Sequence, residues 1–320
     1  MECPQCGTTV QVSDHFCEEC GNPLVTGGSP PTSTGGCAKC GAGKEAIDEE
    51  GYCSSCGFRN QTRERDHLEI TLLPDLGGVT DRGFRHHQNE DHLALQKVEG
   101  KNAEILVVCD GVSSSQSPEL AAKAAAEAAC AALTTAIQNG ISPEAAIKQA
   151  IASALEAVCA VAYTQGLDAD PPSTTIVAAI VIERTATIGW LGDSRAYWIS
   201  ANGSRQLTRD DSWLEEMVAS GQMTAAEAQK SDKAHAITRW LGADAADNCE
   251  PSLINFNIPG AGYLLLCTDG LWNYAPEVEQ MELLVQKIAS TEVMEVARYL
   301  VEFARNSGGH DNITVAVLRR

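Results

Sequence analysis

The chain has few of the features that mark nucleic-acid-binding proteins. Only 5% of its 320 residues are aromatic, and 23 Lys and Arg stand against 43 Asp and Glu, a formal net charge of −20. No run of Lys or Arg is available to neutralise phosphates along a nucleic acid. We therefore expect no nucleic-acid partner, and we expect the acidity mainly to keep the chain soluble.

Long apolar runs and a secretion signal are also missing. No apolar stretch approaches the roughly 18 residues that span a bilayer, and the longest weakly polar segment, residues 121–132, is interrupted by Lys123 and Glu127. The first residues, Met-Glu-Cys-Pro-Gln-Cys, lack the basic end and apolar core of a signal peptide. We expect a cytoplasmic protein with no membrane partner.

Cysteine, by contrast, is abundant, and its spacing is regular. Eight of the 13 cysteines form Cys-x-x-Cys pairs that are each followed by Gly: Cys3/Cys6, Cys17/Cys20, Cys37/Cys40 and Cys53/Cys56. This turn directs two thiolates toward one ion, and Gly supplies the positive φ that it needs. Ten residues separate the first two pairs and twelve the last two, which is hairpin length. Disulfides are the alternative, which the missing signal peptide disfavours.

The spacing predicts two small zinc ribbons, each with four cysteine ligands. They would cover residues 1–25 and 37–60, joined by a flexible Gly/Ser/Pro-rich linker at 26–36. Each would hold one structural Zn²⁺, because a closed site of four thiolates leaves no open coordination position for catalysis. We expect the ribbons to dock a protein partner or to regulate the rest of the chain.

Residues 61–67 are expected to form a second linker, and residues 68–320 one large domain. Strands are predicted near residues 68–73, 91–97, 104–109, 174–182, 185–191, 196–200, 263–267 and 313–318. Helices are predicted near 118–137, 143–165, 277–289 and 291–306. Strands separated by paired helices predict an α+β fold of antiparallel sheets covered by helices. Residues 210–241 are expected to form short helices, either a flap over a site or a surface insertion.

Short acidic motifs accompany these strands. They are Asn89-Glu90-Asp91, Asp110-Gly111, Gly192-Asp193-Ser194-Arg195, Asp269-Gly270 and Asp311-Asn312. A buried strand that ends in Asp directs a carboxylate out of the sheet, and a following Gly lets the backbone carbonyl approach a ligand. Several such ends would make an all-oxygen pocket, which suits Mg²⁺ or Mn²⁺ rather than Zn²⁺. The motifs therefore predict a hydrolytic metal centre.

The order of the motifs carries further information. Thr80-Asp81-Arg82-Gly83 precedes the first of them, and Val108-Cys109-Asp110-Gly111, Ser173-Thr174-Thr175, Gly192-Asp193-Ser194-Arg195, Leu207-Thr208-Arg209-Asp210, Thr268-Asp269-Gly270-Leu271 and Gly309-His310-Asp311-Asn312 follow. This order resembles the metal-dependent Ser/Thr protein phosphatases of type 2C over essentially residues 68–320. Any one motif is weak evidence, but the whole series in order is not a chance match.

The resemblance implies an α-β-β-α sandwich, in which two antiparallel sheets are flanked by helix pairs, with two or three Mg²⁺ or Mn²⁺ ions at one edge. It matches Asp110 to the carboxylate that bridges two metals. One of these metals would also be held by the Gly111 carbonyl and, through water, by Glu90. The other would be held by Asp269 and Asp311, and a third, weaker metal would lie near Asp193.

The same resemblance implies the reaction. Water activated between two cations would attack the phosphorus of phosphoserine or phosphothreonine in line. Asp91 matches a residue that orients the metal-bound water, and Asn312 one that supports the site. Phosphorylated Ser/Thr proteins are the implied substrates, a kinase is the implied signalling partner, and we expect a monomer.

Two positions depart from the family pattern. Its phosphate-binding Arg falls on His86, between Arg85 and His87, and a neutral imidazole cannot reproduce the two-pronged grip of Arg. Either Arg85 swings in, or His86 binds phosphate partly protonated, or substrate affinity is lower; alternatively, the histidines are solvent-facing loop residues. Val112 replaces a His that serves as a general-acid candidate in some members, so a metal-held water would protonate the leaving group.

These departures leave a second hypothesis open. The domain could be a catalytically weak pseudophosphatase that binds phosphoproteins as a regulator or scaffold. A metal-dependent nuclease is a third reading, which the acidic surface disfavours. All the metal-matching carboxylates are present, so we favour an active Mg/Mn-dependent protein-serine/threonine phosphatase.

Overall fold

The computed structural model describes residues 37, 40–47, 53–56, 66–165, 170–245, 249–288 and 292–320. Contacts divide the chain into two units, Met1–Thr62 and Arg63–Arg320. The predicted first ribbon, with Cys3, Cys6, Cys17 and Cys20, lies outside the described residues, as do the linker at 26–36 and residues 61–65 of the second linker.

Two antiparallel sheets form the frame of the larger unit. The order in the six-stranded sheet is β1 (His67–Leu73), β2 (Leu76–Asp81), β13 (Ile313–Arg319), β12 (Tyr263–Cys267), β8 (Arg195–Ile199) and β9 (Arg205–Gln206). The order in the five-stranded sheet is β11 (Ser252–Asn257), β7 (Thr185–Leu191), β6 (Ile176–Ile182), β4 (Ala103–Asp110) and β3 (Asp91–Val98). A short pair joins β5 (Ser173–Thr174) to β10 (Leu241–Gly242).

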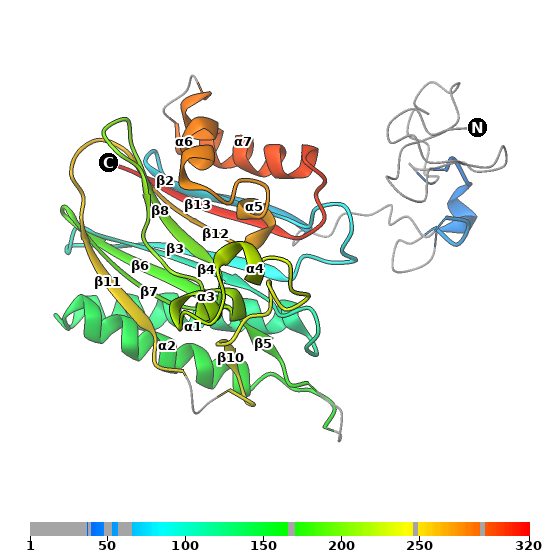
Figure 1. Cartoon of the computed structure of the whole chain (residues 1–320), viewed down its shortest axis with the longest axis horizontal. Coiled ribbons are helices and arrows are strands. Elements are labelled where there is room, and N and C mark those ends of the chain that lie inside the picture. The colour runs from blue at the N-terminus through cyan, green and yellow to red at the C-terminus, as the bar shows by residue number, and fades with distance from the viewer. Residues whose placement is uncertain are drawn as a thin grey trace. The chain divides into compact units, whose positions relative to one another are not determined.

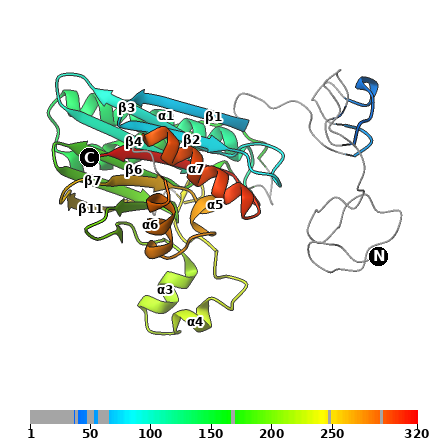
Figure 2. The ribbon, with the colours of Figure 1, turned by 90° about the horizontal axis from the view of Figure 1, so that it is seen from above.

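Helices cover the outer face of each sheet (Figures 1 and 2). α1 (Pro118–Gln138) and α2 (Pro143–Cys159) pack on the five-stranded sheet. α5 (Asp269–Trp272), α6 (Val278–Gln286) and α7 (Val293–Asn306) pack on the six-stranded sheet. A third apolar layer lies between the sheets. The predicted α-β-β-α sandwich is confirmed.

The central strands are buried on both faces, which explains their apolar composition. Every residue of β4 except its last is buried, and so is every residue of β6 except its last. One face of each strand meets the helix pair and the other meets the second sheet, so no polar alternation is possible. This double burial is why both strands could be predicted from apolar runs.

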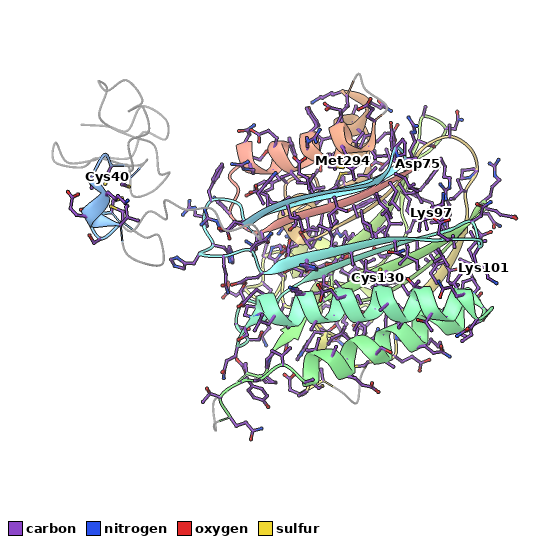
Figure 3. All side chains as sticks on the ribbon, turned by 180° about the vertical axis from the view of Figure 1, so that it is seen from behind. Cys40, Asp75, Lys97, Lys101, Cys130 and Met294 are labelled. Carbon is purple, nitrogen blue, oxygen red and sulfur yellow. The ribbon has the colours of Figure 1, made fainter. Side chains whose placement is uncertain are left out.

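Strand β2 was not predicted, because it is rich in glycine. Its residues Gly77 and Gly78 have low intrinsic strand propensity, but tertiary packing requires them. A Cβ on Gly77 would lie 2.4 Å from the sulfur of Met294 on α7, and one on Gly78 would lie 2.8 Å from the carbonyl oxygen of Val315. Figure 3 shows Met294 between α7 and this strand. Close contact with α7 at Gly77, and with Leu93 of the other sheet and the backbone of β13 at Gly78, therefore selects glycine here rather than local preference.

Helix α2 ends earlier than predicted. It stops at Cys159 rather than near Gln165, because the chain beyond it makes tertiary hydrogen bonds. The backbone N–H of Thr164 donates to Oε1 of Gln116 at 3.0 Å, and the side-chain amide of Gln116 donates to the carbonyl of Thr164 at 3.0 Å. This paired contact takes the place of another helical turn.

Residues 210–241 contain the two short helices expected there, α3 (Trp213–Ala219) and α4 (Ala225–Ala228). Ser212 caps α3 by accepting from the N–H of Glu215, and Thr224 and Glu227 form a capping box on α4. A bridge between Ser212 and Ile237 closes the base of this insertion.

Helix α1 is long and apolar enough, by length and composition, to cross a membrane, so the sequence expectation that no such segment exists was too strict. Its composition follows from packing: a row of fully buried alanines faces the core, and Cys130 lies on the same helix against the sheet (Figure 3). Small side chains let the helix and strands approach closely.

We predict that Ala126→Leu lowers the free energy of unfolding by about 1–3 kcal/mol, because Ala126 is fully buried and extra methylenes would overpack this layer. Ala131→Leu on the exposed side of the same helix is the control, expected to change it by less than about 0.5 kcal/mol. Urea unfolding measures both. Equal midpoints for the two variants would contradict the close packing described here.

Candidate metal centre

Acidic residues from both sheets meet at one end of the sandwich. Asp91 begins β3 and Asp110 ends β4, and the two are directly opposite in the antiparallel pair. Asp269 follows β12 and Asp311 precedes β13, whose facing ends pair with each other. Asp193 follows β7. Like charges placed opposite each other across strands repel, so this end of the fold is costly without a compensating ion.

Burial and mutual repulsion raise the pKa values of four of these carboxyls. Burial, then the charges of its acidic neighbours, raises the pKa of Asp110 well above its usual range. Burial and then the charge of Asp269 do the same for the pKa of Asp193. Burial raises the pKa of Asp91 to about 8, and burial followed by the charge of Asp311 raises that of Asp269 to about 7. Ionising the whole group requires added positive charge.

His86 supplies part of that charge. Its Nε2 lies 3.1 Å from Oδ1 of Asp311 and its Nδ1 lies 3.7 Å from Oε2 of Glu90. Hydrogen bonds to Asp311 and then Glu90 raise the pKa of His86 to about 10, against the effect of burial. Burial would raise the pKa values of Glu90 and Asp311, but the imidazole lowers both. His86 therefore lies among the carboxylates, whereas His87 is exposed.

The donors in this group fit Mg²⁺ or Mn²⁺. They are oxygen atoms only, which is the set that hard divalent cations prefer. Oδ1 of Asp91 is buried and has no hydrogen-bond partner in the described part of the chain. At Gly111 a Cβ would lie 2.6 Å from the carbonyl oxygen of Pro118 and 2.7 Å from that of Glu90. Only glycine passes through this space, and it leaves its own carbonyl without a side chain to shield it.

A hydrogen-bonded chain fixes the other oxygen of Asp91. Oδ2 accepts from the hydroxyls of Thr268 and Thr314, each at 2.8 Å. Thr314 in turn is 2.6 Å from the hydroxyl of Thr80, which accepts from the side-chain amide of Asn89 at 2.8 Å. Sequence reasoning assigned no role to these threonines. Thr80 and Thr268 stand inside the quoted motifs, but a threonine beside an acid has no signature of its own, and Thr314 stands two residues after the last motif.

Other backbone and side-chain contacts hold Asp110. Its carbonyl accepts from the N–H of Thr175 and the hydroxyl of Thr174, both at 2.8 Å, and its N–H donates to the Thr175 hydroxyl at 3.2 Å. Nearby, the hydroxyl of Ser113 donates to Oε2 of Glu90 at 2.6 Å. Ser113 was also missed; its position just after Asp-Gly was the available signal.

A tryptophan side chain holds the backbone of Asp193. Nε1 of Trp272 donates to its carbonyl at 2.9 Å, and the guanidinium of Arg195 stacks over the Trp272 ring at 3.7 Å. Arg195 also makes a two-pronged pair with Asp210, at 2.9 and 2.7 Å, where the α3–α4 insertion begins. The Asp193 segment and the base of that insertion are therefore tied together.

Asn312 joins the segments that carry Glu90 and Asp311. Its Oδ1 accepts from the N–H of Glu90 at 2.7 Å, and its amide donates to the carbonyls of Arg82 and Gln88 at 2.8 and 3.1 Å. Arg85, in contrast, is exposed and makes no ion pair within the described residues. The structure thus gathers the predicted acids, Asn312 and His86, but does not bring Arg85 to them.

The geometry agrees with comparisons to known proteins. A family model described as protein phosphatase 2C matches residues 85–304, more than half of the chain. The chain belongs to this family. The serine/threonine phosphatase stp of Listeria welshimeri is 31% identical over 244 residues, which cover 75% of this chain and 94% of that protein.

Two other phosphatases are similar to this phosphatase 2C chain. The serine/threonine protein phosphatase PstP of Mycobacterium tuberculosis is 27% identical over 248 residues, covering 78% of this chain and 45% of that protein. The crystal structure of the serine/threonine phosphatase Stp1 from Staphylococcus aureus matches with a TM-score of 0.66 at 26% identity, covering 81% of this chain and 99% of that one.

The smaller unit contains a separate cluster of thiols. The sulfurs of Cys37, Cys40, Cys53 and Cys56 all lie within 4.8 Å of one another. The Cys37–Cys56 and Cys40–Cys53 sulfur distances are both 3.6 Å, near the roughly 3.8 Å edge of a tetrahedral zinc site with four sulfur ligands. Burial opposes ionisation of Cys53, but hydrogen bonds from the backbone at Ser55 and from neighbouring thiols lower its pKa to about 7. Thiolates of this kind suit Zn²⁺.

We predict that, without metal, Asp110→Asn raises the free energy of unfolding by on the order of 1 kcal/mol, because it removes a carboxyl whose ionisation is opposed by burial and by its acidic neighbours. Wild type should gain about 2.7 kcal/mol when Mg²⁺ is present at 100 times its Kd, and Asp110→Asn much less. The exposed Asp232→Asn is the matched control and should behave as wild type. Equal stabilisation of wild type and Asp110→Asn by Mg²⁺ would exclude a metal at this carboxylate.

Proposed function

We propose that the chain is a Mg²⁺- or Mn²⁺-dependent protein-serine/threonine phosphatase that hydrolyses phosphoserine and phosphothreonine in proteins. Family membership and relatives named as serine/threonine phosphatases support this reaction class. The observation that carries the proposal is the group of oxygen donors around Asp110. Burial and repulsion raise the pKa values of Asp110 and Asp193 within it. Such a group suits two cations, with a third near Asp193.

When bound, the cations supply a polarised water and positive charge beside the phosphate. The positions of the acidic residues suggest which of them would hold the cations. Asp110 would hold both ions, because it lies between Asp91 and the acids at the ends of β12 and β13. Asp269 and Asp311 would complete one site, and Glu90 with the carbonyl of Gly111 the other.

The remaining side chains would orient the reactants. With Oδ2 of Asp91 engaged by two threonine hydroxyls, its Oδ1 is left to accept a hydrogen bond from the attacking water. The His86 imidazole, whose two nitrogens face Asp311 and Glu90, would offer positive charge beside the phosphate instead of the two-pronged grip of an arginine. Asn312 would keep Glu90 and Asp311 in fixed positions relative to each other. Val112 offers no proton to the leaving oxygen.

The cysteine-rich unit is proposed to hold zinc and to serve docking or regulation. Four gathered sulfurs from Cys37, Cys40, Cys53 and Cys56 support one structural Zn²⁺. The equivalent spacing of Cys3, Cys6, Cys17 and Cys20 supports a second. Closed sites of this kind stabilise a small fold rather than take part in hydrolysis.

Purified full-length chain with Mn²⁺ is expected to hydrolyse p-nitrophenyl phosphate and a phosphothreonine peptide. Asp110→Ala should abolish both activities, because the proposed bridge is lost. Asp75→Ala, in the turn between β1 and β2 (Figure 3), is the matched control and should remain active. If wild type and Asp110→Ala show the same residual rate while the peptide still binds, the result contradicts the phosphatase proposal and supports the pseudophosphatase hypothesis.

Metal analysis should find about two zinc ions per chain after Mg²⁺ is removed by dialysis. Cys40→Ser should reduce this to about one, because three sulfurs bind Zn²⁺ less tightly than four. The exposed Cys159→Ser, outside the cluster, should leave the count at that of wild type. Zinc well below one per chain with all thiols free would rule out the ribbons.

A further inference from the structure

The loop between β2 and β3 carries His86, the residue that departs from the family pattern. No helix or strand includes residues 82–90, so hydrogen bonds within and around the loop set the position of the imidazole. That position is tightly constrained, because the imidazole lies between Glu90 and Asp311 and the His86 side chain is only 24% exposed.

Arg82 at the start of the loop makes the contact that spans it. Its Nη1 donates to the carbonyl oxygen of His86 at 2.8 Å. A guanidinium is long and rigid enough to cross this four-residue interval, and its permanent charge strengthens the bond to the carbonyl. The backbone of His86 is therefore held by the side chain of Arg82.

The backbone of Arg82 is fixed on both sides. Its N–H donates to the carbonyl of Asp66 at 2.8 Å, and its carbonyl accepts from the side-chain amide of Asn312 at 2.8 Å. Asn312 is the same residue that accepts from the N–H of Glu90. The guanidinium thus extends from a rigid base that is itself joined to the acidic segments.

The turn between Arg82 and His86 is fastened separately. The N–H of Gly83 donates to Oδ1 of Asp81 at 2.8 Å, while Oδ2 of Asp81 pairs with Nδ1 of His67 at 2.7 Å. The N–H of Phe84 donates to the carbonyl of Gly309 at 2.7 Å. Gly83 has a φ of +68°, and a Cβ there would collide with the backbone of Asp311. With these anchors in place, the Arg82 contact fixes the loop at His86, and Asn312 holds it further on, at Gln88 and Glu90.

We propose that Arg82 is a positioning residue for His86. It acts on substrate through the imidazole: by holding the His86 backbone it keeps the ring between Glu90 and Asp311, at the centre where phosphate would bind. The proposal rests on the proposed function of the centre. It assigns to Arg82 part of the task that an arginine at position 86 would perform by contact, namely keeping a side chain fixed beside the phosphate.

A double-mutant cycle between Arg82 and His86 tests this. Kinetics of the full-length chain with Mn²⁺ are measured on a phosphothreonine peptide and on p-nitrophenyl phosphate for Arg82→Met, His86→Ala and the double variant. Arg82→Met should lower kcat/KM by about 10- to 100-fold, chiefly through KM. In the His86→Ala background the same change should alter kcat/KM by less than about twofold, since residues that act through one another are not additive.

Two further variants separate positioning from general destabilisation. Arg82→Lys should recover much of the lost kcat/KM, because an ammonium can donate to the same carbonyl. Arg184→Met is the matched control. Arg184 lies in the turn between β6 and β7, and its guanidinium also donates to a backbone carbonyl, that of Ile258, at 3.0 Å. It should leave KM unchanged in both backgrounds.

Equal effects of Arg82→Met in the two backgrounds would overturn the proposal, since Arg82 would then act independently of His86, either on the phosphate or on the fold. Should Arg82→Met not fold, Arg82→Gln, whose side chain is too short to span the loop, carries the same cycle. A wild type that hydrolyses neither substrate would instead refute the proposed function.

Discussion

The structure depends on one electrostatic constraint, the gathering of several buried or half-buried carboxyls at one end of a two-sheet sandwich. Asp110 and Asp91 face each other across a strand pair, and Asp269 and Asp311 arrive from the other sheet. Burial and repulsion raise most of their pKa values, and the imidazole of His86 offsets only the side near Glu90 and Asp311. Cations bound there, as proposed, would offset this cost.

The rest of the larger unit holds these groups against their repulsion. Double-faced burial fixes β4 and β6, and α7 packs closely over Gly77 of β2. At the ends of the strands, short polar side chains take over: threonines on Asp91 and Asp110, Trp272 and Arg195 around Asp193, and Asn312 between the loops. Asp91, Asp110 and Asp193 are thus held by backbone or hydroxyl contacts, and their remaining oxygens are left for ligands.

Much of this could be predicted from the sequence, because strongly patterned segments carry their own signal. β7 and β12 were predicted at their observed bounds, and the acidic motifs were predicted to meet. The glycine strand β2 and the end of α2 were missed, since α7 packing and the Gln116–Thr164 hydrogen bonds decide them. The threonines on Asp91 and the Arg82–His86 contact were also missed, because they depend on distances that sequence spacing does not encode.

The most direct test of the two-metal centre is anomalous diffraction from crystals soaked in Mn²⁺. The account predicts two strong peaks, about 3.5–4 Å apart, on either side of the Asp110 carboxylate, one beside Asp269 and Asp311 and the other beside Glu90 and Gly111. A single peak, or peaks that do not share Asp110, would contradict it.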